Sequence, residues 1–88
     1  MQVAYESAFL RDLKRTRSKN IRLRVQQVIQ DVKTASSPLD IVSLTKLRGY
    51  ERFYRIRIGD YRLGIEIVED TVIFVRFLHR RDIYRYFP

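Results

Sequence analysis

The residues of this chain best suited to do chemistry are three arginines on a predicted β-hairpin. Apolar and polar residues alternate on both sides of Gly59-Asp60, and a glycine there fits a two-residue turn because it readily adopts a positive φ. This turn sets a register in which Arg57 faces Arg62 and Arg55 faces Gly64. Facing guanidinium groups repel each other, so a sequence keeps such a pair mainly where a bound anion or a partner's carboxylates neutralise it. The solvent face of the hairpin is therefore a candidate phosphate site.

The same face has room for further contacts to an anion. Gly64, opposite Arg55, would leave a dent in which a backbone phosphate can approach closely. The competing interpretation is a solvated strand face whose charges only keep the sheet soluble. The repulsive pairing and the gathering of the arginines on one side favour a binding site.

The end of the chain adds basic and aromatic residues, namely His79, Arg80, Arg81, Tyr84 and Tyr86. Aromatic rings beside guanidinium groups suit single-stranded RNA, because a base stacks on a ring while phosphates meet the arginines. The alternative is that Ile83, Tyr84 and Phe87 simply pack the tail onto the sheet, and these residues alone do not decide between the two. A lone histidine at the end of a strand, such as His79, is more simply a structural residue than an acid or a base.

Composition agrees with a polyanion as partner. The chain has 88 residues, with 18 Lys+Arg against 10 Asp+Glu and a formal net charge of +8. So basic a small domain most often meets nucleic acid or an acidic protein. There is no cysteine and one histidine, which excludes a disulfide framework, a thiol nucleophile and the usual metal sites. With no apolar run of the ~20 residues that span a bilayer and no signal-peptide pattern, we expect a soluble, cytoplasmic protein with no cofactor and no membrane contact.

Apolar positions predict a short strand and two helices in the first part of the chain. Residues 2–5 alternate as in a strand, and Ser7 is a candidate N-cap of a helix that reaches about Thr16. The apolar face of this helix is expected to consist of Phe9, Leu10 and Leu13. After a break at residues 18–20, a second helix runs to residues 36–38, with an apolar stripe made of Ile21, Val25, Val28, Ile29 and Val32.

The second part of the chain reads as three strands and a tail. Residues 39–51 are mixed, with Leu44 and Leu47 as expected core anchors, and a Glu69-Asp70 turn precedes a last strand that ends near Leu78. The order β-α-α-β-β-β predicts one α+β domain over residues 1–88. It would combine an N-terminal strand, an antiparallel helical hairpin, a three-stranded antiparallel meander and a short C-terminal tail. The helices would cover one face of the sheet and leave the other open.

The last strand can pair with the hairpin in two registers. A two-residue loop at 69–70 would pair Leu63 with Arg76 and place an arginine in the core. One more loop residue instead pairs Ile73, Val75 and Phe77 with Ile67, Ile65 and Leu63, and moves Arg76 beside Gly64 on the basic face. We expect the longer loop, because an unpaired buried charge costs several kcal/mol.

Three blocks of this sequence together resemble the RelE/ParE superfamily of bacterial and archaeal toxins from type II toxin–antitoxin pairs. They are KLRG at residues 46–49, YRIRIGDYR at 54–62 and LHRRDIY at 78–84, and the similarity in element order covers nearly the whole chain. The chain looks closer to the RelE branch, whose members have a microbial-RNase-like fold and cut messenger RNA in the ribosomal A site. The ParE branch instead poisons DNA gyrase.

The resemblance implies a metal-independent endoribonuclease in which the 2′-hydroxyl of the RNA attacks the adjacent phosphate. By position, Arg55 and Arg57 would hold the phosphate and assist activation of the 2′-hydroxyl, and Arg62 would stabilise the transition state. Arg80 would protonate the leaving group, and Tyr84 would stack on a base. Further RNA contacts are expected from Lys46, Arg48, Arg76, His79 and Arg81.

The chain departs from the best-known RelE pattern, which has lysines at the positions of Arg55 and Arg57. An arginine, with a pKa above ~12, is a poor general base, so Tyr84 or the ribosome would share the proton transfer, or the enzyme would be slow. The expected partners are messenger RNA on the ribosome, with contacts to 16S rRNA, and an acidic cognate antitoxin in a hetero-oligomer. The alternative is a non-enzymatic gyrase poison of the ParE type.

Overall fold

The computed structural model describes residues 1–88. The elements are β1 (Gln2–Tyr5), α1 (Ser7–Arg15), α2 (Lys19–Thr34), the 3-10 helix η1 (Pro38–Asp40), β2 (Thr45–Lys46), β3 (Phe53–Ile58), β4 (Tyr61–Val68), β5 (Thr71–His79) and α3 (Ile83–Tyr86). One five-stranded sheet has the order β1-β5-β4-β3-β2, with β1 parallel to β5 and the other pairs antiparallel. The predicted α+β class and element order are confirmed, and β2, η1 and α3 are additional to the prediction.

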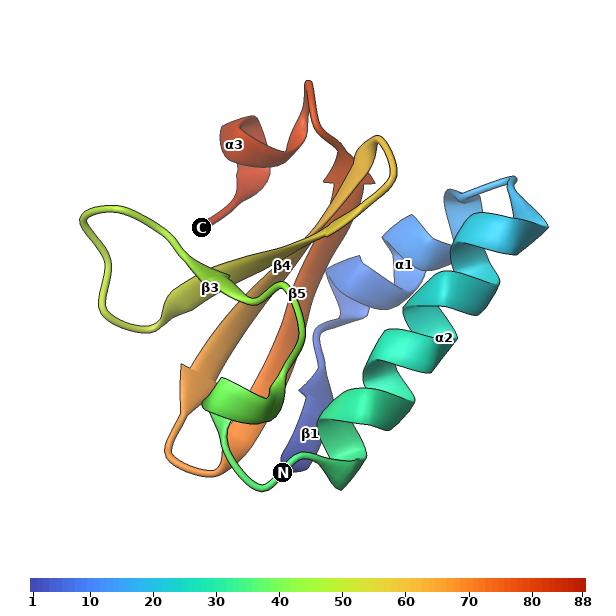
Figure 1. The fold of residues 1–88 in the computed structure, drawn as a ribbon. Helices are drawn as coiled ribbons and strands as arrows, with labels where there is room; N and C mark the ends of the chain where they lie inside the picture. The colour runs from blue at the N-terminus through green and yellow to red at the C-terminus, as the bar shows by residue number, and fades with distance from the viewer.

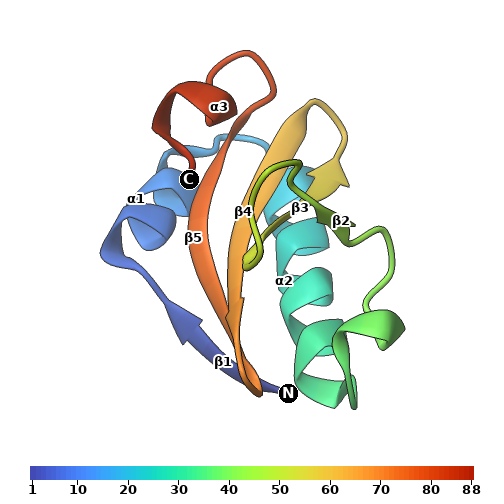
Figure 2. The same ribbon diagram turned by 90° about the vertical axis from the view of Figure 1, so that its left-hand side faces the viewer.

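The helices divide between the two faces of the sheet. Helices α1 and α2 lie on one side and the short α3 lies on the other (Figure 1). Figure 2 views the molecule from the side of β2 and α3, with α2 behind the sheet. The outer face predicted to be open is therefore partly covered, because the tail folds back over it and buries Ile83 and Phe87. No helix is both long enough and apolar enough to cross a membrane.

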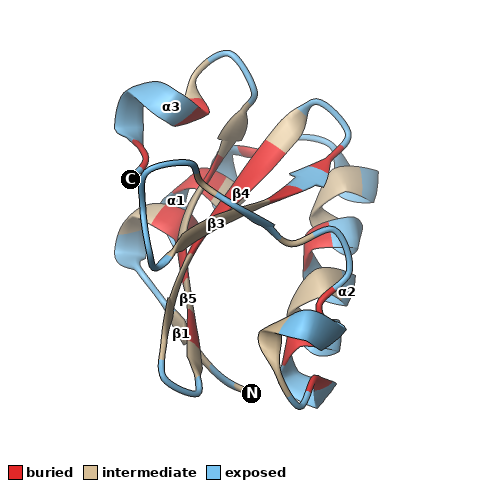
Figure 3. Ribbon diagram, turned by 60° about the vertical axis from the view of Figure 1, so that its left-hand side comes forward, coloured by how far each residue is buried: buried red, intermediate tan, exposed pale blue.

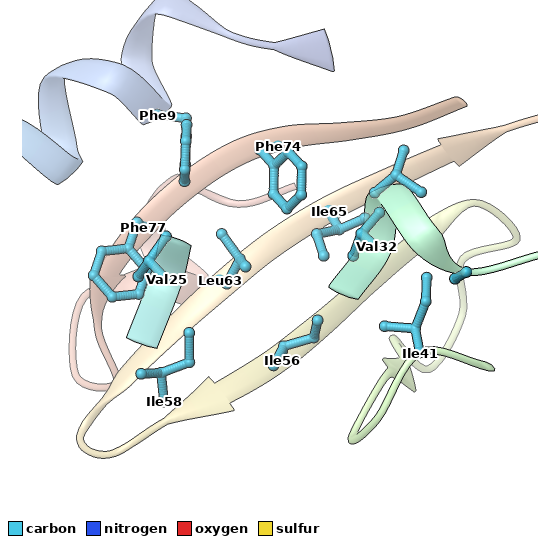
Figure 4. Close-up of a cluster of buried hydrophobic side chains, with 12 residues drawn as sticks. Phe9, Val25, Val32, Ile41, Ile56, Ile58, Leu63, Ile65, Phe74 and Phe77 are labelled. Carbon is cyan, nitrogen blue, oxygen red and sulfur yellow. The ribbon is translucent and has the colours of Figure 1, made fainter. Parts of the chain in front are cut away.

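The core lies between the sheet and the two long helices (Figure 4). The predicted stripe of α2 is confirmed, since Val25 and Val32 are fully buried and Ile21, Val28 and Ile29 pack beside them. The sheet contributes Ile56, Ile58, Leu63, Ile65, Val72, Phe74 and Phe77. Of the residues before β3, Leu44 packs against this core as predicted, whereas Leu47 lies outside it and Ile41 is the buried anchor.

Helix α1 differs from its prediction at both its start and its apolar face. Its N-cap is Glu6, not Ser7, because the Glu6 amide still donates to Phe74 O of β5 at 2.9 Å and the helix begins directly after this strand pairing. Leu10 is 51% exposed, and the inward face consists of Phe9, Asp12, Leu13 and Thr16. These positions follow the i, i+3, i+4, i+7 spacing of one helix face, from which Leu10 deviates by about 100°.

The β3–β4 hairpin has the predicted register. Arg57 pairs with Arg62, and Arg55 pairs with Gly64. Gly59 has a φ of 59°, as the two-residue turn requires. The arginines therefore share the outer face of the hairpin, opposite the face that packs on α2.

The β4–β5 pairing combines the two registers that the sequence allows. The loop has two residues, so Val68 pairs with Thr71 and Ile65 with Phe74, and the expected longer loop is wrong. A register shift next to Gly64 then leaves Val75 as an extra residue on β5. Beyond it Gly64 pairs with Arg76 and Leu63 with Phe77, as predicted. The bulge lets Val72 and Phe74 enter the core near the turn and still keeps Arg76 out of it.

Candidate functional site

The basic face is centred on a buried arginine. Arg62 is 7% exposed, and its Nη1 donates to the carbonyl oxygens of Gly59 at 3.1 Å and Tyr61 at 2.9 Å. Both acceptors belong to the hairpin turn or its first strand residue, so the turn fixes the guanidinium. Burial lowers the pKa of Arg62, and the positive charges of Arg57 and Arg55 lower it further.

The other predicted catalytic residues surround this guanidinium. Arg80 and Tyr84 also act on the pKa of Arg62, the arginine lowering it and the phenol raising it, so all five residues lie within electrostatic reach of one point. The Arg80 amide donates to Asp60 O at 2.7 Å, which ties the start of the tail to the hairpin turn. Tyr84 is 56% exposed on α3 and is free to meet a ligand. Figure 3 shows that α3 is largely exposed apart from the buried residue at its start.

The cluster carries positive charge that no carboxylate neutralises. The ion pairs of the molecule join Arg52 to Glu66, Arg76 to Asp12 and Arg81 to Asp82. Arg55, Arg57, Arg62 and Arg80 take part in none of them. The arrangement of four guanidinium groups without counter-charges is one that suits an anion of more than one negative charge. The phosphate site predicted from the facing pair stays a prediction.

Arg76 lies beside Gly64 as predicted, but its guanidinium is engaged elsewhere. Its Nε and Nη2 donate to the two carboxylate oxygens of Asp12 at 2.7 and 3.0 Å, and this hydrogen bonding raises the pKa of Arg76. The same carboxylate accepts from the Phe77 amide at 3.1 Å. Arg76 therefore fastens α1 to the part of β5 that β1 does not pair with, and a contact with RNA would have to compete with Asp12.

His79 has the structural surroundings that the simpler interpretation describes. It pairs with Tyr61 across the sheet, its ring meets the Tyr61 ring edge-on at 5.7 Å, and its Nδ1 accepts from the Arg81 amide at 3.2 Å. Tyr61 packs against the core, so His79 lies on the helix side of the sheet, away from Arg62.

The remaining residues predicted to contact RNA stand apart from the cluster. Arg81 is exposed and lies 3.8 Å from the carboxylate of Asp82. Lys46 and Arg48 are exposed on β2 and the loop after it, and neither is among the groups that shift the pKa of Arg62. The structure thus brings together the five predicted catalytic residues and leaves these basic residues at the periphery.

The dent predicted at Gly64 does not exist, because the tail fills it. A Cβ at Gly64 would lie 2.8 Å from the ring of Phe87, which is almost fully buried. Sequence reasoning also missed Asp12, although a carboxylate on the buried stripe of α1 was a readable signal. No group of His, Cys, Asp or Glu side chains lies close enough together to hold a metal ion.

Comparison with known proteins agrees with this fold and identifies the family. Residues 3–84 match the family model described as "ParE toxin of type II toxin-antitoxin system, parDE". The chain belongs to this family, and it is accordingly a toxin of a type II toxin–antitoxin pair. The superfamily resemblance drawn from the sequence is confirmed.

Two relatives from Methanocaldococcus jannaschii carry RelE names. The chain is 43% identical over 89 residues to "Toxin RelE3", with 100% of both chains covered. It is 30% identical to "Putative toxin RelE1", over 83% of this chain and 81% of the relative.

Solved structures of toxins share the fold. The RelB-RelE antitoxin-toxin complex from Methanococcus jannaschii matches with a TM-score of 0.81 and 41% identity, over 97% of this chain and 99% of that chain. The RelBE2 complex from Mycobacterium tuberculosis matches with a TM-score of 0.70 and 26% identity, over 92% of each chain. The isolated E. coli RelE toxin, at 14% identity and a TM-score of 0.67 over 89% of this chain and 82% of that chain, shares the fold alone.

Proposed function

We propose that this toxin is a ribosome-dependent endoribonuclease that cuts messenger RNA in the A site and so stops translation. The observation that carries the proposal is the buried Arg62, which turn carbonyls hold in place among Arg55, Arg57 and Arg80. None of these four arginines forms an ion pair with a carboxylate. Tyr84 stands exposed at the edge of the same cluster. Together these groups fit a nucleotide, with its phosphate at the arginines and its base at Tyr84.

The chemistry asks little of the protein beyond orientation and charge. The 2′-hydroxyl oxygen bonds to the adjacent phosphorus as the 5′-oxygen leaves, so the products are a 2′,3′-cyclic phosphate and a free 5′-hydroxyl. One proton must leave the 2′-oxygen and another must reach the 5′-oxygen. The extra negative charge of the pentacovalent transition state requires donors that are already in place, and Arg62 meets this requirement because its side chain is fixed before the substrate binds.

Each residue of the cluster has a role that fits its placement. Arg55 and Arg57 hold the phosphate from the strand, and Arg62 stabilises the transition state from the centre. Arg80, fixed to Asp60 through its backbone, serves the leaving oxygen. Tyr84 stacks on a base and sets the position of the scissile bond.

The cluster contains no convincing general base, and this supports a need for the ribosome. Its members are arginines and one tyrosine, and the histidine of the chain lies on the other side of the sheet. Proton removal from the 2′-hydroxyl would then depend on Tyr84 or on groups and RNA geometry that the A site supplies.

We therefore expect purified toxin to cut naked RNA very slowly and ribosome-bound message quickly. Primer extension on a programmed ribosome, beside the same RNA without ribosomes, measures both rates. The matched control is the same ribosome complex with its A site occupied by transfer RNA, in which cleavage should stop. Efficient cleavage of free RNA at physiological salt would contradict ribosome dependence.

The alternative function is a non-enzymatic poison of DNA gyrase. It is favoured by the ParE description of the matching family model and by the lack of a general base in the cluster. Under this alternative, the toxin would inhibit supercoiling by gyrase in vitro and leave ribosome-bound message intact. In cells, DNA synthesis would fall before amino-acid incorporation, whereas the proposed function reverses that order.

The partner proposed for the toxin is an acidic cognate antitoxin in a hetero-oligomer, as the RelB-RelE complexes of the relatives suggest. Its Asp or Glu side chains would neutralise Arg55, Arg57 and Arg62 directly, since these guanidinium groups have no counter-charge in the free toxin. Displacement of the tail, or bulk that keeps the complex out of the A site, are the other ways in which it could inhibit.

Charge neutralisation predicts an association rate that falls steeply as salt rises. Stopped-flow mixing of toxin and antitoxin over a range of ionic strengths measures this slope. The double variant Arg57→Ala/Arg62→Ala should flatten the slope, while Arg11→Ala, an exposed arginine on α1 with no ion pair, should change it little. A rate indifferent to salt, or unchanged affinity in the double variant, would place the inhibitory contact elsewhere.

A further inference from the structure

A glycine in the middle of β4 makes space for the end of the chain. Gly64 does not have a positive φ, so an L-residue would fit its backbone. A Cβ there would nevertheless lie 2.8, 2.8 and 2.9 Å from three ring carbons of Phe87. Contacts this short do not occur in folded proteins, so the ring could not keep its place beside any larger residue. The glycine is needed for its lack of a side chain and not for its backbone freedom.

We call the place over Gly64 that the Phe87 ring occupies the Phe87 seat, and further contacts hold the ring there. The Phe53 ring meets it edge-on at 5.7 Å with an interplanar angle of 89°, and Tyr50 meets Phe53 in the same way. Phe87 is only 2% exposed. The ring is therefore held from below by the strand backbone and from the side by an aromatic pair.

The seat of Phe87 also sets the orientation of α3. The Phe87 amide donates to Ile83 O at 2.8 Å, and both side chains are buried, so these two residues form the inward side of a single helical turn. Tyr84 and Tyr86 lie between them and are more than half exposed. With both ends of the turn anchored, Tyr84 has a defined direction toward solvent.

A second, independent contact holds the same turn. The guanidinium carbon of Arg76 lies 5.3 Å from the centroid of the Tyr86 ring, in a cation–π arrangement. Asp12 fixes Arg76 in this position. The tail is thus attached to two strands of the sheet, to β4 at Gly64 and to β5 at Arg76, whose guanidinium Asp12 of α1 holds in place.

We propose that Gly64 and Phe87 are positioning residues, which hold the turn that presents Tyr84 to the RNA base. Neither residue reaches the substrate, and both act through Tyr84. The catalytic part of this inference rests on the proposed function, whereas the seat itself can be tested without any activity.

The seat is tested by proteolysis of the native toxin. Trypsin cleavage after Arg85, followed by mass spectrometry, should accelerate about tenfold in Gly64→Ala and in Phe87→Ala, because each frees the turn for the protease. The double variant should be cut no faster than Phe87→Ala, since the added methyl no longer meets a ring. Additive effects, or a tail of Gly64→Ala as resistant as the natural one, would show that Gly64 acts through the sheet and would overturn the seat. Circular dichroism melting of each variant confirms that the core is folded during digestion.

The positioning role is tested by kinetics on ribosome-bound message. Both single variants should lose about tenfold in kcat with KM nearly unchanged, and Tyr84→Ala should cause little further loss in the Phe87→Ala background. Full kcat in variants whose tail is demonstrably released would overturn the positioning role. If the natural toxin cuts no message, the proposed function fails, and the proteolysis result still decides whether Gly64 seats the tail.

Discussion

Arg62→Ala should lower kcat for message cleavage about a hundredfold while leaving KM nearly unchanged. The reason is geometric. The side chain is held by two turn carbonyls before any substrate arrives, so its donors are aimed at a fixed point and interact most strongly where charge develops. Arg55 and Arg57 remain in the variant and continue to bind the ground-state phosphate. Single-turnover kinetics on programmed ribosomes separates the chemical step from binding.

The matched control for this loss is Arg11→Ala, which removes an exposed arginine from the helix face of the molecule and should change kcat by less than about twofold. Arg62→Lys, which keeps the charge but not the planar fork, should recover only part of the rate. Equal losses in Arg62→Ala and Arg11→Ala would mean that the arginines act only as a general attraction for RNA.

Replacement of Arg62 should change the stability of the fold little. Burial first, and then the charges of Arg57 and Arg55, lower the pKa of Arg62, so folding disfavours its charged form. Arg62→Met keeps most of the aliphatic packing and removes the repulsion, so the Tm should stay the same or rise. A Tm that falls as it does for a truncated core residue would contradict this expectation and show that Arg62 also stabilises the fold.

Asp12→Ala should lower the free energy of unfolding by about 3–5 kcal/mol, the largest stability loss expected of any single surface or helix charge here. The change leaves the Arg76 guanidinium and the Phe77 amide without their acceptor, the Asp12 carboxylate. The Asp12 side chain is 3% exposed, so water does not readily take the place of this carboxylate. For a domain of this size such a loss is a large fraction of the total stability. Urea unfolding followed by circular dichroism measures it.

Two variants make the Asp12 result interpretable. Asp31→Ala removes an exposed carboxylate with one side-chain partner, Gln27, and should cost less than about 1 kcal/mol. Asp12→Ala/Arg76→Met removes both charges of the buried pair and should recover part of the loss, because no uncompensated charge remains. A small effect of Asp12→Ala alone would show that water replaces the carboxylate at this edge of β5.

The sequence predicts the hairpin and its arginines well because one local signal decides them. Gly59-Asp60 allows a single tight turn, and once the turn is placed the alternation of the two arms determines which residues face each other. The β4–β5 pairing has no such signal. Both alternating sets of residues along β5 are mostly apolar, so either set could face the core. The sequence therefore does not reveal a bulge at Val75, which uses one register near the turn and the other beyond it.

The sequence does not predict which side chains of the tail are buried and which are exposed, and the reason is different. The choice between a packed tail and one that binds a ligand assumed that its aromatic residues act together. The turn of α3 instead separates them, with Ile83 and Phe87 inward and Tyr84 and Tyr86 outward. This division depends on the space above Gly64, and a glycine in a strand indicates a close approach without revealing what approaches.

The Gly59-Asp60 turn constrains how the chain can vary in length. Surface turns are the usual places where related proteins gain or lose residues. In this turn, however, the Gly59 carbonyl holds the Arg62 side chain and the Asp60 carbonyl holds the Arg80 backbone. One inserted residue would shift these two attachments relative to each other and separate the centre of the cluster from its tail. The length of this exposed turn is therefore as restricted as the identity of the arginines that it aligns, and a relative with a longer turn would have to anchor those arginines in another way.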